Sequence, residues 1–378
     1  MSLNYSKKEE SSFLSETKFR ISVKSVYGQS SDNKLIFGDN FESMKILLQD
    51  YNMAGKIDLV YIDPPFATNN IFKFSEKRTS TISNSDSDQI AYTDVLNHDE
   101  YLEFLFKRLI LIRELMAEHS SIYLHIDYKI GHYVKILMDK IFGKSNFRND
   151  ITRIKCNPKN FKRKGYGNIK DLILFYSKNS DFVWNEPMAP FSDKDIEILY
   201  PKIDKQGRRY TTVPLHAPGE TKIGKSGQEW NGIKPPIGRH WRYDFKILNE
   251  LNEKGLIEWS KNDNPRKIVY ATEALKKGKR LQDIWDFKDM QYPDYPTEKN
   301  VDLLKTIIRT SSEKNSLVFD CFAGSSTTLV AAEALQRKWI GIDNSKAGIQ
   351  VSLKKLIGDE NQLFKPSFQY LELNDSYV

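Results

Sequence analysis

The sequence predicts an α/β fold with a doubly wound, mostly parallel sheet. Short β-branched runs alternate with segments of helical periodicity over residues 34–176, and the same alternation resumes over residues 298–343. Such alternation is typical of a parallel sheet with helices on both faces. Between these blocks, residues 181–290 are rich in aromatic, basic, proline and glycine residues. We therefore expect one sheet domain, formed by residues 34–180 and 291–378, with an insertion between its two parts.

The expected elements follow a polar arm, residues 1–33, which we expect to be flexible. In the first part, hydrophobic periodicity predicts a strand within 34–40, a helix at 41–49, a strand at 57–62, a flexible loop at 75–94, a helix at 98–117, a strand at 121–126, a helix at 128–142, and strands near 151–155 and 171–176. In the second part it predicts a helix at 298–311, a strand at 316–320, a turn and helix at 322–337, and a strand at 338–343.

Composition excludes several classes of protein. With 378 residues, of which 39% are hydrophobic, the chain can bury a large core. No apolar run approaches the roughly 20 residues that span a bilayer, and the polar start is unlike a signal peptide. We therefore expect a cytoplasmic protein with no membrane partner. Cys156 and Cys321 lie far apart without metal-ligand spacing, which argues against a disulfide framework and a metal site.

The positive charge lies in the middle of the chain. The net charge is +7, yet residues 148–178 hold nine Lys or Arg against two acids, and residues 205–246 hold nine against three. Aromatic side chains are interleaved with both windows. This pattern indicates a polyanion-binding face, although a lysine-rich solvated surface has the same composition.

Three acids stand at the ends of expected strands. Asp320 precedes a small-residue turn and a helix, which is how doubly wound folds present backbone N–H groups to a nucleotide-like ligand. Asp343 ends the next strand about 20 residues later, a spacing that suits hydrogen bonds to the ribose hydroxyls of an adenosine. Asp39 follows the first strand and could accept from the adenine amino group. Each acid alone also fits a loop or cap role, but three at one sheet edge predict a nucleotide site.

A competing signal lies in the insertion. Residues 219–226, GETKIGKS, match the phosphate-loop pattern GxxxxGK[ST], which binds a triphosphate only between a hydrophobic strand and a helix. Here Pro214 and Pro218 precede the segment and NGIKPPIG follows it. We therefore interpret it as part of the basic insertion.

Four segments together resemble the DNA amino-methyltransferases that use S-adenosylmethionine. They are DPPF at 63–66, PTEKNVDLLKTII at 296–308, FDCFAGSSTT at 319–328 and IGIDNS at 340–345. DPPF before the glycine loop, with a long segment between, is similar to the β-group order of adenine-specific enzymes of restriction-modification systems, in the branch of type III modification subunits and their solitary relatives. The resemblance implies a Rossmann-like methyltransferase sheet with a circularly permuted motif order and an inserted DNA-recognition region.

The chain departs from the family pattern at four positions. Cys321 stands for the usual Pro and Ser326 for the usual Gly of the loop, Phe66 for the commoner Tyr, and Asn300 for the Pro after Lys299. The change at position 326 leaves the contacts between the loop and the cofactor open.

The resemblance also gives DPPF a chemical role. The lone pair of the adenine amino nitrogen is delocalised into the ring, and acceptors for its two protons favour a pyramidal, reactive nitrogen. Asp63 is expected to supply one acceptor. The carbonyl of Pro64 is expected to be the other, because Pro65 restricts the preceding residue to extended conformations. Phe66 is expected to stack on the flipped base.

The remaining site residues are implied in the same way. The cofactor-binding set places Asp39 at the adenine edge, Asp343 at the ribose, Asp63 near the methionine amino group and Lys299 in the segment that closes over the cofactor. Phe322, Gly324, Ser325 and Thr327 are placed at the methionine end, and Asp320 completes the set. Candidate DNA contacts in the insertion are Arg208, Arg209, Arg239 and Arg242. Double-stranded DNA is the expected partner, and a homodimer and a separate restriction subunit are further candidates.

The expected reaction is methyl transfer to the amino group of a flipped-out adenine, with three alternatives. Methylation of cytosine at N4 uses the same geometry, but enzymes of that kind usually carry Ser in place of Asp63. A silent DNA-binding subunit would not need Asp63, Pro64, Pro65 and Asp343 intact. A nicotinamide-dependent oxidoreductase would need GxGxxG, which the turn after residue 320 lacks.

Overall fold

The computed structural model describes residues 17–29, 32–65, 71–74, 89–93, 98–158, 162, 164–221, 224–261, 264–289, 298–358 and 366–375. The chain divides into two compact units. The first comprises Met1–Pro187 and Gln282–Val378, and the second comprises Met188–Leu281.

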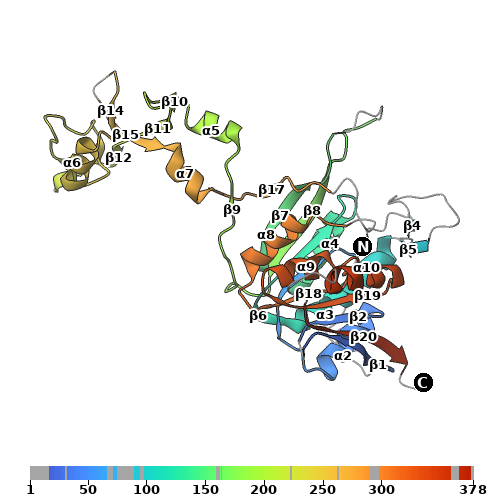
Figure 1. Ribbon diagram of the computed structural model, residues 1–378. Coiled ribbons are helices and arrows are strands. Elements are labelled where there is room, and N and C mark those ends of the chain that lie inside the picture. The colour runs from blue at the N-terminus through green and yellow to red at the C-terminus, as the bar shows by residue number, and fades with distance from the viewer. Residues whose placement is uncertain are drawn as a thin grey trace. The chain divides into compact units, whose positions relative to one another are not determined.

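The first unit is built on a ten-stranded sheet (Figure 1). Its strands are β1 (Phe19–Tyr27), β2 (Lys34–Phe37), β3 (Ile57–Ile62), β6 (Met116–Ile126), β7 (Phe147–Ile154), β8 (Lys170–Ser177), β17 (Ile284–Trp285), β18 (Leu317–Asp320), β19 (Lys338–Asp343) and β20 (Phe368–Asp375). Their order is β1-β20-β2-β19-β18-β3-β6-β8-β7-β17. From β20 to β6 all neighbours are parallel, so the expected parallel sheet is confirmed.

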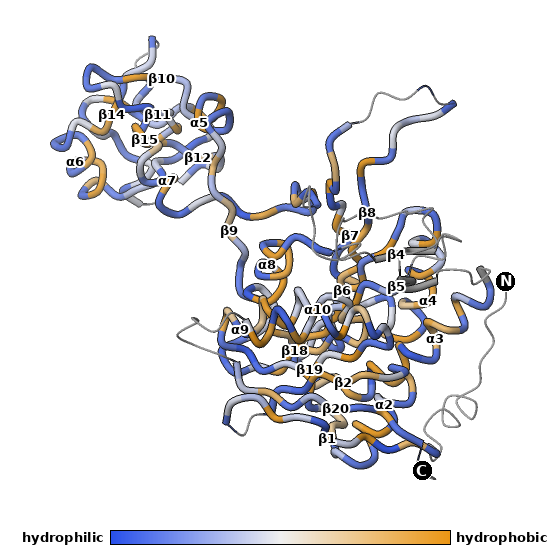
Figure 2. The backbone as a smooth tube through the Cα atoms, turned by 45° about the vertical axis from the view of Figure 1, so that its right-hand side comes forward, coloured by the Kyte–Doolittle hydropathy of each residue, from blue (hydrophilic) through white to orange (hydrophobic). Residues whose placement is uncertain are grey.

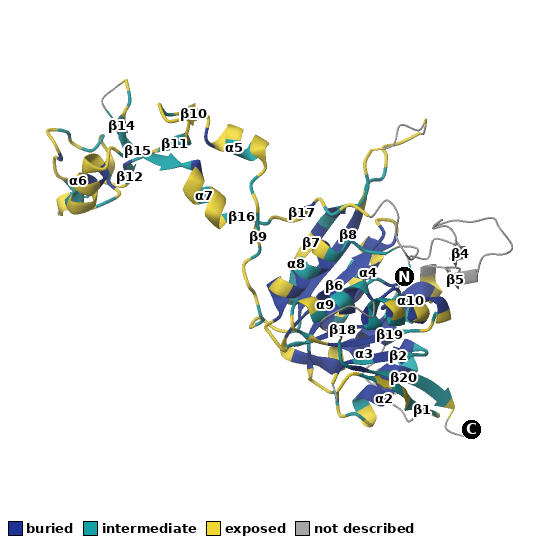
Figure 3. Ribbon diagram, viewed as in Figure 1, coloured by how far each residue is buried: buried dark blue, intermediate teal, exposed yellow. Residues whose placement is uncertain are grey.

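Two groups of helices cover this sheet. α2 (Asn40–Gln49), α3 (His98–Leu115) and α4 (Gly131–Phe142) pack together as one group, and α8 (Val301–Ser311), α9 (Thr327–Ala334) and α10 (Lys346–Ile357) pack together as the other (Figure 1). Strands with helices on both faces should be apolar throughout rather than alternating. Accordingly, five of the six residues of β3 are buried, and the central strands carry the hydrophobic and buried segments in Figures 2 and 3.

Several expectations for the first unit need correction. The flexible arm expected at 1–33 is wrong for residues 19–27, because β1 pairs antiparallel with β20 from Phe19 to Tyr27, with one irregularity between Val23 and Ser25. The strand expected near 171–176 is β8, which runs antiparallel to both β6 and β7. The loop expected at 75–94 contains β5 (Gln89–Thr93), which pairs with β4 (Ile71–Phe74), and the rest of that loop lies outside the described residues.

The second unit has a fold of its own. Its strands are β9 (Met188–Ala189), β10 (Lys202–Ile203), β11 (Arg209–Pro214), β12 (His216–Pro218), β13 (Arg239–Trp241), β14 (Ile257–Trp259), β15 (Pro265–Tyr270) and β16 (Lys279–Arg280), and its helices are α5 (Asp193–Leu199), α6 (Phe245–Glu253) and α7 (Ala271–Lys277). Strands β10-β11-β15-β14 form a sheet. A small core of buried apolar residues holds the unit together, namely Leu215, Trp230, Trp241, Leu248 and Leu251.

The segment GETKIGKS does not lie between a strand and an α-helix. The three-residue strand β12 precedes it, and a single 3₁₀ turn, Lys225–Gly227, follows Gly224. In the described part of the chain, no helix is long and apolar enough to cross a membrane.

Candidate active site

Four acids meet at one edge of the main sheet. Asp39 follows β2, Asp343 ends β19, Asp320 ends β18 and Asp63 follows β3. These four strands are neighbours and run parallel, so their carboxyl ends lie side by side. In open α/β sheets this edge is where ligands bind. The topology therefore gathers the acids that were expected to form a site.

Asp63 has one engaged and one unengaged carboxylate oxygen. Its Oδ2 lies 2.7 Å from Lys299 Nζ. Its Oδ1 is buried and has no hydrogen-bond partner among the described residues. Pro64 behind it is buried and Pro65 is half-buried. A buried acceptor without a donor is costly unless a ligand supplies one. Phe66 lies outside the described residues.

Asp320 is buried beneath this edge. Its Oδ1 accepts from the backbone N–H of Phe322 at 3.0 Å, and its Oδ2 accepts from Thr328 Oγ1 at 2.6 Å. Burial, together with the neighbouring carboxylates of Asp63 and Asp343, raises the pKa of Asp320 to about 7. The two hydrogen bonds act in the opposite direction and lower it. The side chain thus fixes the start of the loop between β18 and α9.

Asp343 fixes the middle of the same loop. Its Oδ2 accepts from the backbone N–H of Gly324 and its Oδ1 from that of Ser345, both at 2.7 Å. Burial raises its pKa to about 6. Gly348 lies against this pair, since a Cβ there would come within 3.0 Å of the carbonyl oxygen of Gly324. Each carboxylate oxygen keeps a further lone pair, so Asp343 can still accept from a ligand.

The loop places the other predicted residues along this edge. Phe322 is half-buried against Phe104, with ring centroids 6.1 Å apart, and the hydroxyls of Ser325 and Thr327 lie 3.2 Å apart. Ser326, which stands where the family pattern has Gly, has a left-handed backbone with φ 58°. This conformation costs roughly 1–2 kcal/mol for a residue with a Cβ. Its buried hydroxyl offsets part of that by donating to Ser352 Oγ at 2.7 Å.

Asp39 belongs to a polar network that the sequence did not reveal. Its Oδ1 caps α2 by accepting from two backbone N–H groups, and its Oδ2 lies 3.1 Å from Arg108 Nη2. Arg108 Nε also donates to Asn40 Oδ1 at 2.5 Å, and Asn40 Nδ2 donates to the carbonyl of Cys321 at 2.8 Å. The network joins the ends of β2 and β18. Neither Asn40 nor Arg108 belongs to a sequence motif, and only their position in the fold shows that they contact this site.

A second buried network lies under Asp63. Asp171, at the start of β8, accepts from Lys155 Nζ at 2.7 Å, contacts His125 Nε2 at 3.3 Å and lies 3.5 Å from Arg153 Nη1. Burial alone would raise the pKa of Asp171, but His125, Lys155 and Lys299 lower it instead. Arg153, fully buried, also donates from Nε to the carbonyl of Phe287 at 2.7 Å and pairs with Asp289.

The pKa values predict how stability depends on pH. The folded protein holds protons on Asp320 and Asp343 more tightly than the unfolded chain does, so their contribution falls as pH rises from about 4 to about 7. Asp320→Asn keeps the shape of the side chain but cannot ionise. Its Oδ1 can still accept from the N–H of Phe322, and its Nδ2 can donate to Thr328 Oγ1. The free energy of unfolding, measured in urea, falls between about pH 5 and pH 8, and this fall should be about 1–3 kcal/mol smaller in the variant than in the parent. Asp302→Asn, at an exposed acid, is the control and should follow the parent. An identical pH profile for Asp320→Asn would contradict the assignment.

The four candidate DNA contacts fall into two pairs in the second unit. Arg208 Nε bonds to Asp204 Oδ2 at 2.8 Å, and Arg209 lies 3.6 Å from Glu197. The exposed residues Arg239 and Arg242 instead converge on His216, which they contact at 3.2 and 3.1 Å. No carboxylate among the described residues pairs with either of them. Burial lowers the pKa of His216, and Arg239, Arg242 and Arg266 lower it further, which marks a concentration of positive charge.

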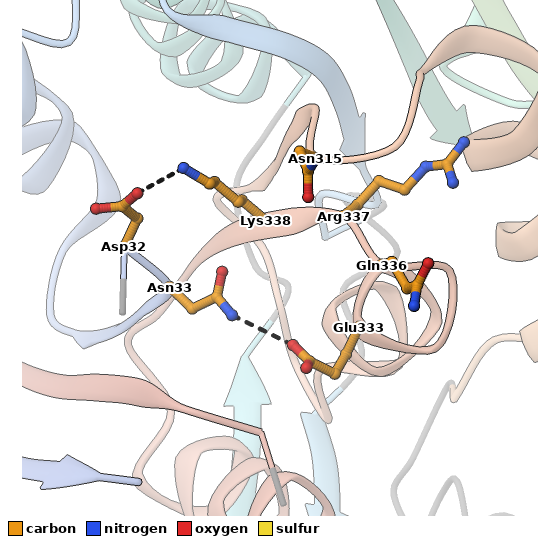
Figure 4. Close-up of a pocket in the computed structure, with 7 residues that line it drawn as sticks. All are labelled: Asp32, Asn33, Asn315, Glu333, Gln336, Arg337 and Lys338. Atoms are coloured by element: carbon orange, nitrogen blue, oxygen red, sulfur yellow. Dashed lines mark hydrogen bonds and ion pairs between the residues drawn. The ribbon is translucent and has the colours of Figure 1, made fainter. Parts of the chain in front are cut away.

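A surface pocket of about 250 Å³ lies at the opposite edge of the sheet (Figure 4). It is lined by Asp32, Asn33, Asn315, Glu333, Gln336, Arg337 and Lys338. Its polar groups already serve the fold, because Asn33 Nδ2 donates to Glu333 and Lys338 pairs with Asp32. It therefore contributes nothing to the site at the carboxyl edge.

The DNA methylase family, of the N6/N4 type, matches residues 57–354. The chain is 38% identical to the type II methyltransferase M.EcaI of Enterobacter cloacae, covering 94% of this chain and 77% of that protein. It is 26% identical to the Mod subunit of the type III restriction-modification enzyme StyLTI of Salmonella typhimurium, covering 82% of this chain and 51% of the subunit. The chain thus spans about half the length of that relative. Among solved structures, the M1.HpyAVI–SAM complex aligns over 85% of this chain and 98% of its own, with a TM-score of 0.45 and 17% identity.

Proposed function

Because the chain belongs to the N6/N4 family of DNA methylases, we propose that it transfers a methyl group from S-adenosylmethionine to the exocyclic amino group of a flipped-out adenine in duplex DNA. The observation that carries this proposal is the buried Oδ1 of Asp63, which has no hydrogen-bond partner among the described residues. It is a hydrogen-bond acceptor in the DPPF segment, at the sheet edge where the other acids gather. An amino group supplies N–H donors, and a carboxylate oxygen can accept a hydrogen bond from one of them. The aspartate, in a place where cytosine-N4 enzymes usually carry serine, favours adenine.

The residues at the sheet edge fit S-adenosylmethionine, which when bound supplies an electrophilic methyl group. Burial raises the pKa values of Asp320 and Asp343, and the carboxylates of Asp63 and Asp343 raise that of Asp320 further. A cationic ligand would relieve this repulsion at Asp320. We assign Asp343 to the ribose hydroxyls and Asp39 to the adenine edge, through the lone pairs that their present bonds leave. The loop residues Phe322, Gly324, Ser325 and Thr327 would line the methionine end.

Asp63 and Pro64 act on the target base in this mechanism. Asp63 Oδ1 would accept a hydrogen bond from one amino N–H and the carbonyl of Pro64 from the other. Both contacts favour a pyramidal nitrogen, whose lone pair is withdrawn from the ring π system and can point towards the methyl group. Holding the two reactants in line supplies much of the acceleration. Phe66 is assigned to stacking on the extruded base, a contact worth about 1–3 kcal/mol in comparable sites.

The test is product analysis. The purified chain is incubated with genomic DNA from an unmethylated host and a tritiated methyl donor, and the DNA is digested to nucleosides and separated by mass. We expect N6-methyladenine. Label in N4-methylcytosine would show that the target base is cytosine. DNA binding without any label would indicate a silent DNA-binding subunit. Because the StyLTI relative is a subunit of a restriction-modification enzyme, a restriction subunit is a candidate partner, as is a second copy of this chain.

Arg239 and Arg242 are proposed to contact DNA phosphates. Their guanidinium groups are exposed and close to one another, with no described carboxylate to neutralise them. Arg239→Gln/Arg242→Gln should weaken binding to every duplex about tenfold or more and reduce the slope of log affinity against log salt by about two.

Arg208 and Arg209 provide the matched control, because acids already pair with both. Arg208→Gln/Arg209→Gln should change affinity by less than about threefold. Fluorescence anisotropy of a labelled duplex at several salt concentrations measures both double variants. Equal losses from the two pairs would contradict the proposed phosphate contacts, and a loss on one sequence only would indicate base recognition instead.

A further inference from the structure

The backbone around Lys299 is held on both sides. Glu298 pairs with Lys355 of α10. Asn300 caps α8, because its Oδ1 accepts from the backbone N–H of Asp302 at 2.9 Å, and its Nδ2 donates to the carbonyl of Lys288 at 3.0 Å. A proline could occupy the first turn of a helix but could make neither of these side-chain bonds. The family's usual Pro is thus replaced by a residue that anchors this segment.

Lys299 reaches from this segment to the carboxylate of Asp63. The ion pair measures 2.7 Å, and the two side chains are only 11% and 17% exposed. Lys299 binds Oδ2, while Oδ1 has no hydrogen-bond partner in the part of the chain that the structure describes. It also lies close enough to the buried network below to lower the pKa values of His125 and Asp171. It therefore lies near both the carboxylate of Asp63 and that network.

We propose that Lys299 is a positioning residue for the methyl-transfer reaction, and this rests on the proposed function. By binding Oδ2, its ammonium group fixes the rotation of the Asp63 carboxylate so that Oδ1 is presented to the amino group of the target base. This differs from a role in closing over the cofactor, because Lys299 acts here through Asp63.

A kinetic experiment separates the two roles. Lys299→Met keeps an unbranched apolar chain without the charge, Lys299→Arg keeps the charge, and Lys314→Met removes an exposed lysine as the control. Methyl transfer is measured in single turnovers with saturating DNA over a range of S-adenosylmethionine concentrations, and cofactor affinity is measured by calorimetry.

At saturating cofactor we expect Lys299→Met to be slower at least about tenfold, with Lys299→Arg restored to within about threefold of the parent and Lys314→Met unchanged. If Lys299→Met reached the parental rate once the cofactor was saturating, Lys299 would only bind the cofactor and the positioning role would be overturned. Absence of transfer by the parent chain would overturn the proposed function itself, and the positioning role with it.

A second readout does not depend on turnover. Removing one partner of a buried ion pair leaves the other charge uncompensated, whereas removing both does not. The melting temperature of Lys299→Met should therefore fall, and adding Asp63→Asn should recover part of that fall. Strictly additive shifts in the four-member cycle of parent, single and double variants would show that the two side chains are not coupled, and would overturn the proposal.

Discussion

Asp63→Ala is expected to slow methyl transfer at least about a hundredfold while DNA affinity stays within about twofold. The carboxylate lies at the end of β3, and its buried Oδ1, which no described residue bonds, can accept a hydrogen bond from the target amino group. Alanine removes that acceptor, and with it one of the two hydrogen bonds that favour a pyramidal, reactive nitrogen. DNA affinity should persist, because the proposed phosphate contacts lie in the second unit.

Three assays on one preparation measure this prediction. Tritiated methyl incorporation gives the rate, anisotropy gives DNA affinity, and a 2-aminopurine target base reports unstacking by its fluorescence. Asp58→Ala is a control within the same strand, since Asp58 lies at the start of β3 with its Oδ2 accepting from the N–H of Leu317 at 2.7 Å. It should affect stability more than the rate constant. Parental methylation by Asp63→Ala would exclude the proposed mechanism.

The largest loss of stability is expected from Asp171→Asn. Asp171 is the buried counterion of Lys155 and Arg153, and asparagine keeps its shape but removes its charge. Removing one partner from a buried charge network typically costs about 3–5 kcal/mol. Asp289, which pairs with Arg153, can offset only part of the charge. We therefore expect a loss in this range, measured by urea unfolding near neutral pH.

The pH dependence gives this prediction a second check. The pKa of Asp171 is lowered in the folded protein, so its contribution is present above the pKa of the unfolded chain and is lost as pH falls below about 4. The difference between Asp171→Asn and the parent should therefore shrink in acid. Asp150→Asn, at an exposed acid on β7, is the control and should change stability by about 0.5 kcal/mol or less. A similarly small effect of Asp171→Asn at neutral pH would mean that the network is not a source of stability.

Much of the active edge could be predicted from the sequence. Short β-branched runs ending in Asp63, Asp320 and Asp343 already indicated parallel strands whose carboxyl ends gather acids. That inference needs only the periodicity of each strand and the rule that parallel neighbours end at one edge. The structure also agrees with the early rejection of GETKIGKS as a phosphate loop, because no α-helix follows it directly.

The partners of these residues could not be predicted. Lys299 lies 236 positions after Asp63 in the sequence, and Arg108 lies 69 after Asp39. Nothing in the local pattern of either residue distinguishes a buried ion pair from a solvated surface charge, since local propensity says nothing about which distant group will be near. The four candidate arginines likewise formed one set in the sequence, and only the positions of Asp204, Glu197 and His216 divide them.

The sequence by itself determined the class of fold, the order of most elements and the acids that follow the parallel strands, because these depend on local periodicity and on residue type. Tertiary structure alone decided that residues 19–27 form an edge strand with β20, that β8 runs antiparallel, and that one oxygen of Asp63 has no partner among the residues described. Strand pairing and charge pairing are contacts between distant parts of the chain. Their free energy comes from burial and from geometry that exist only after the chain has folded.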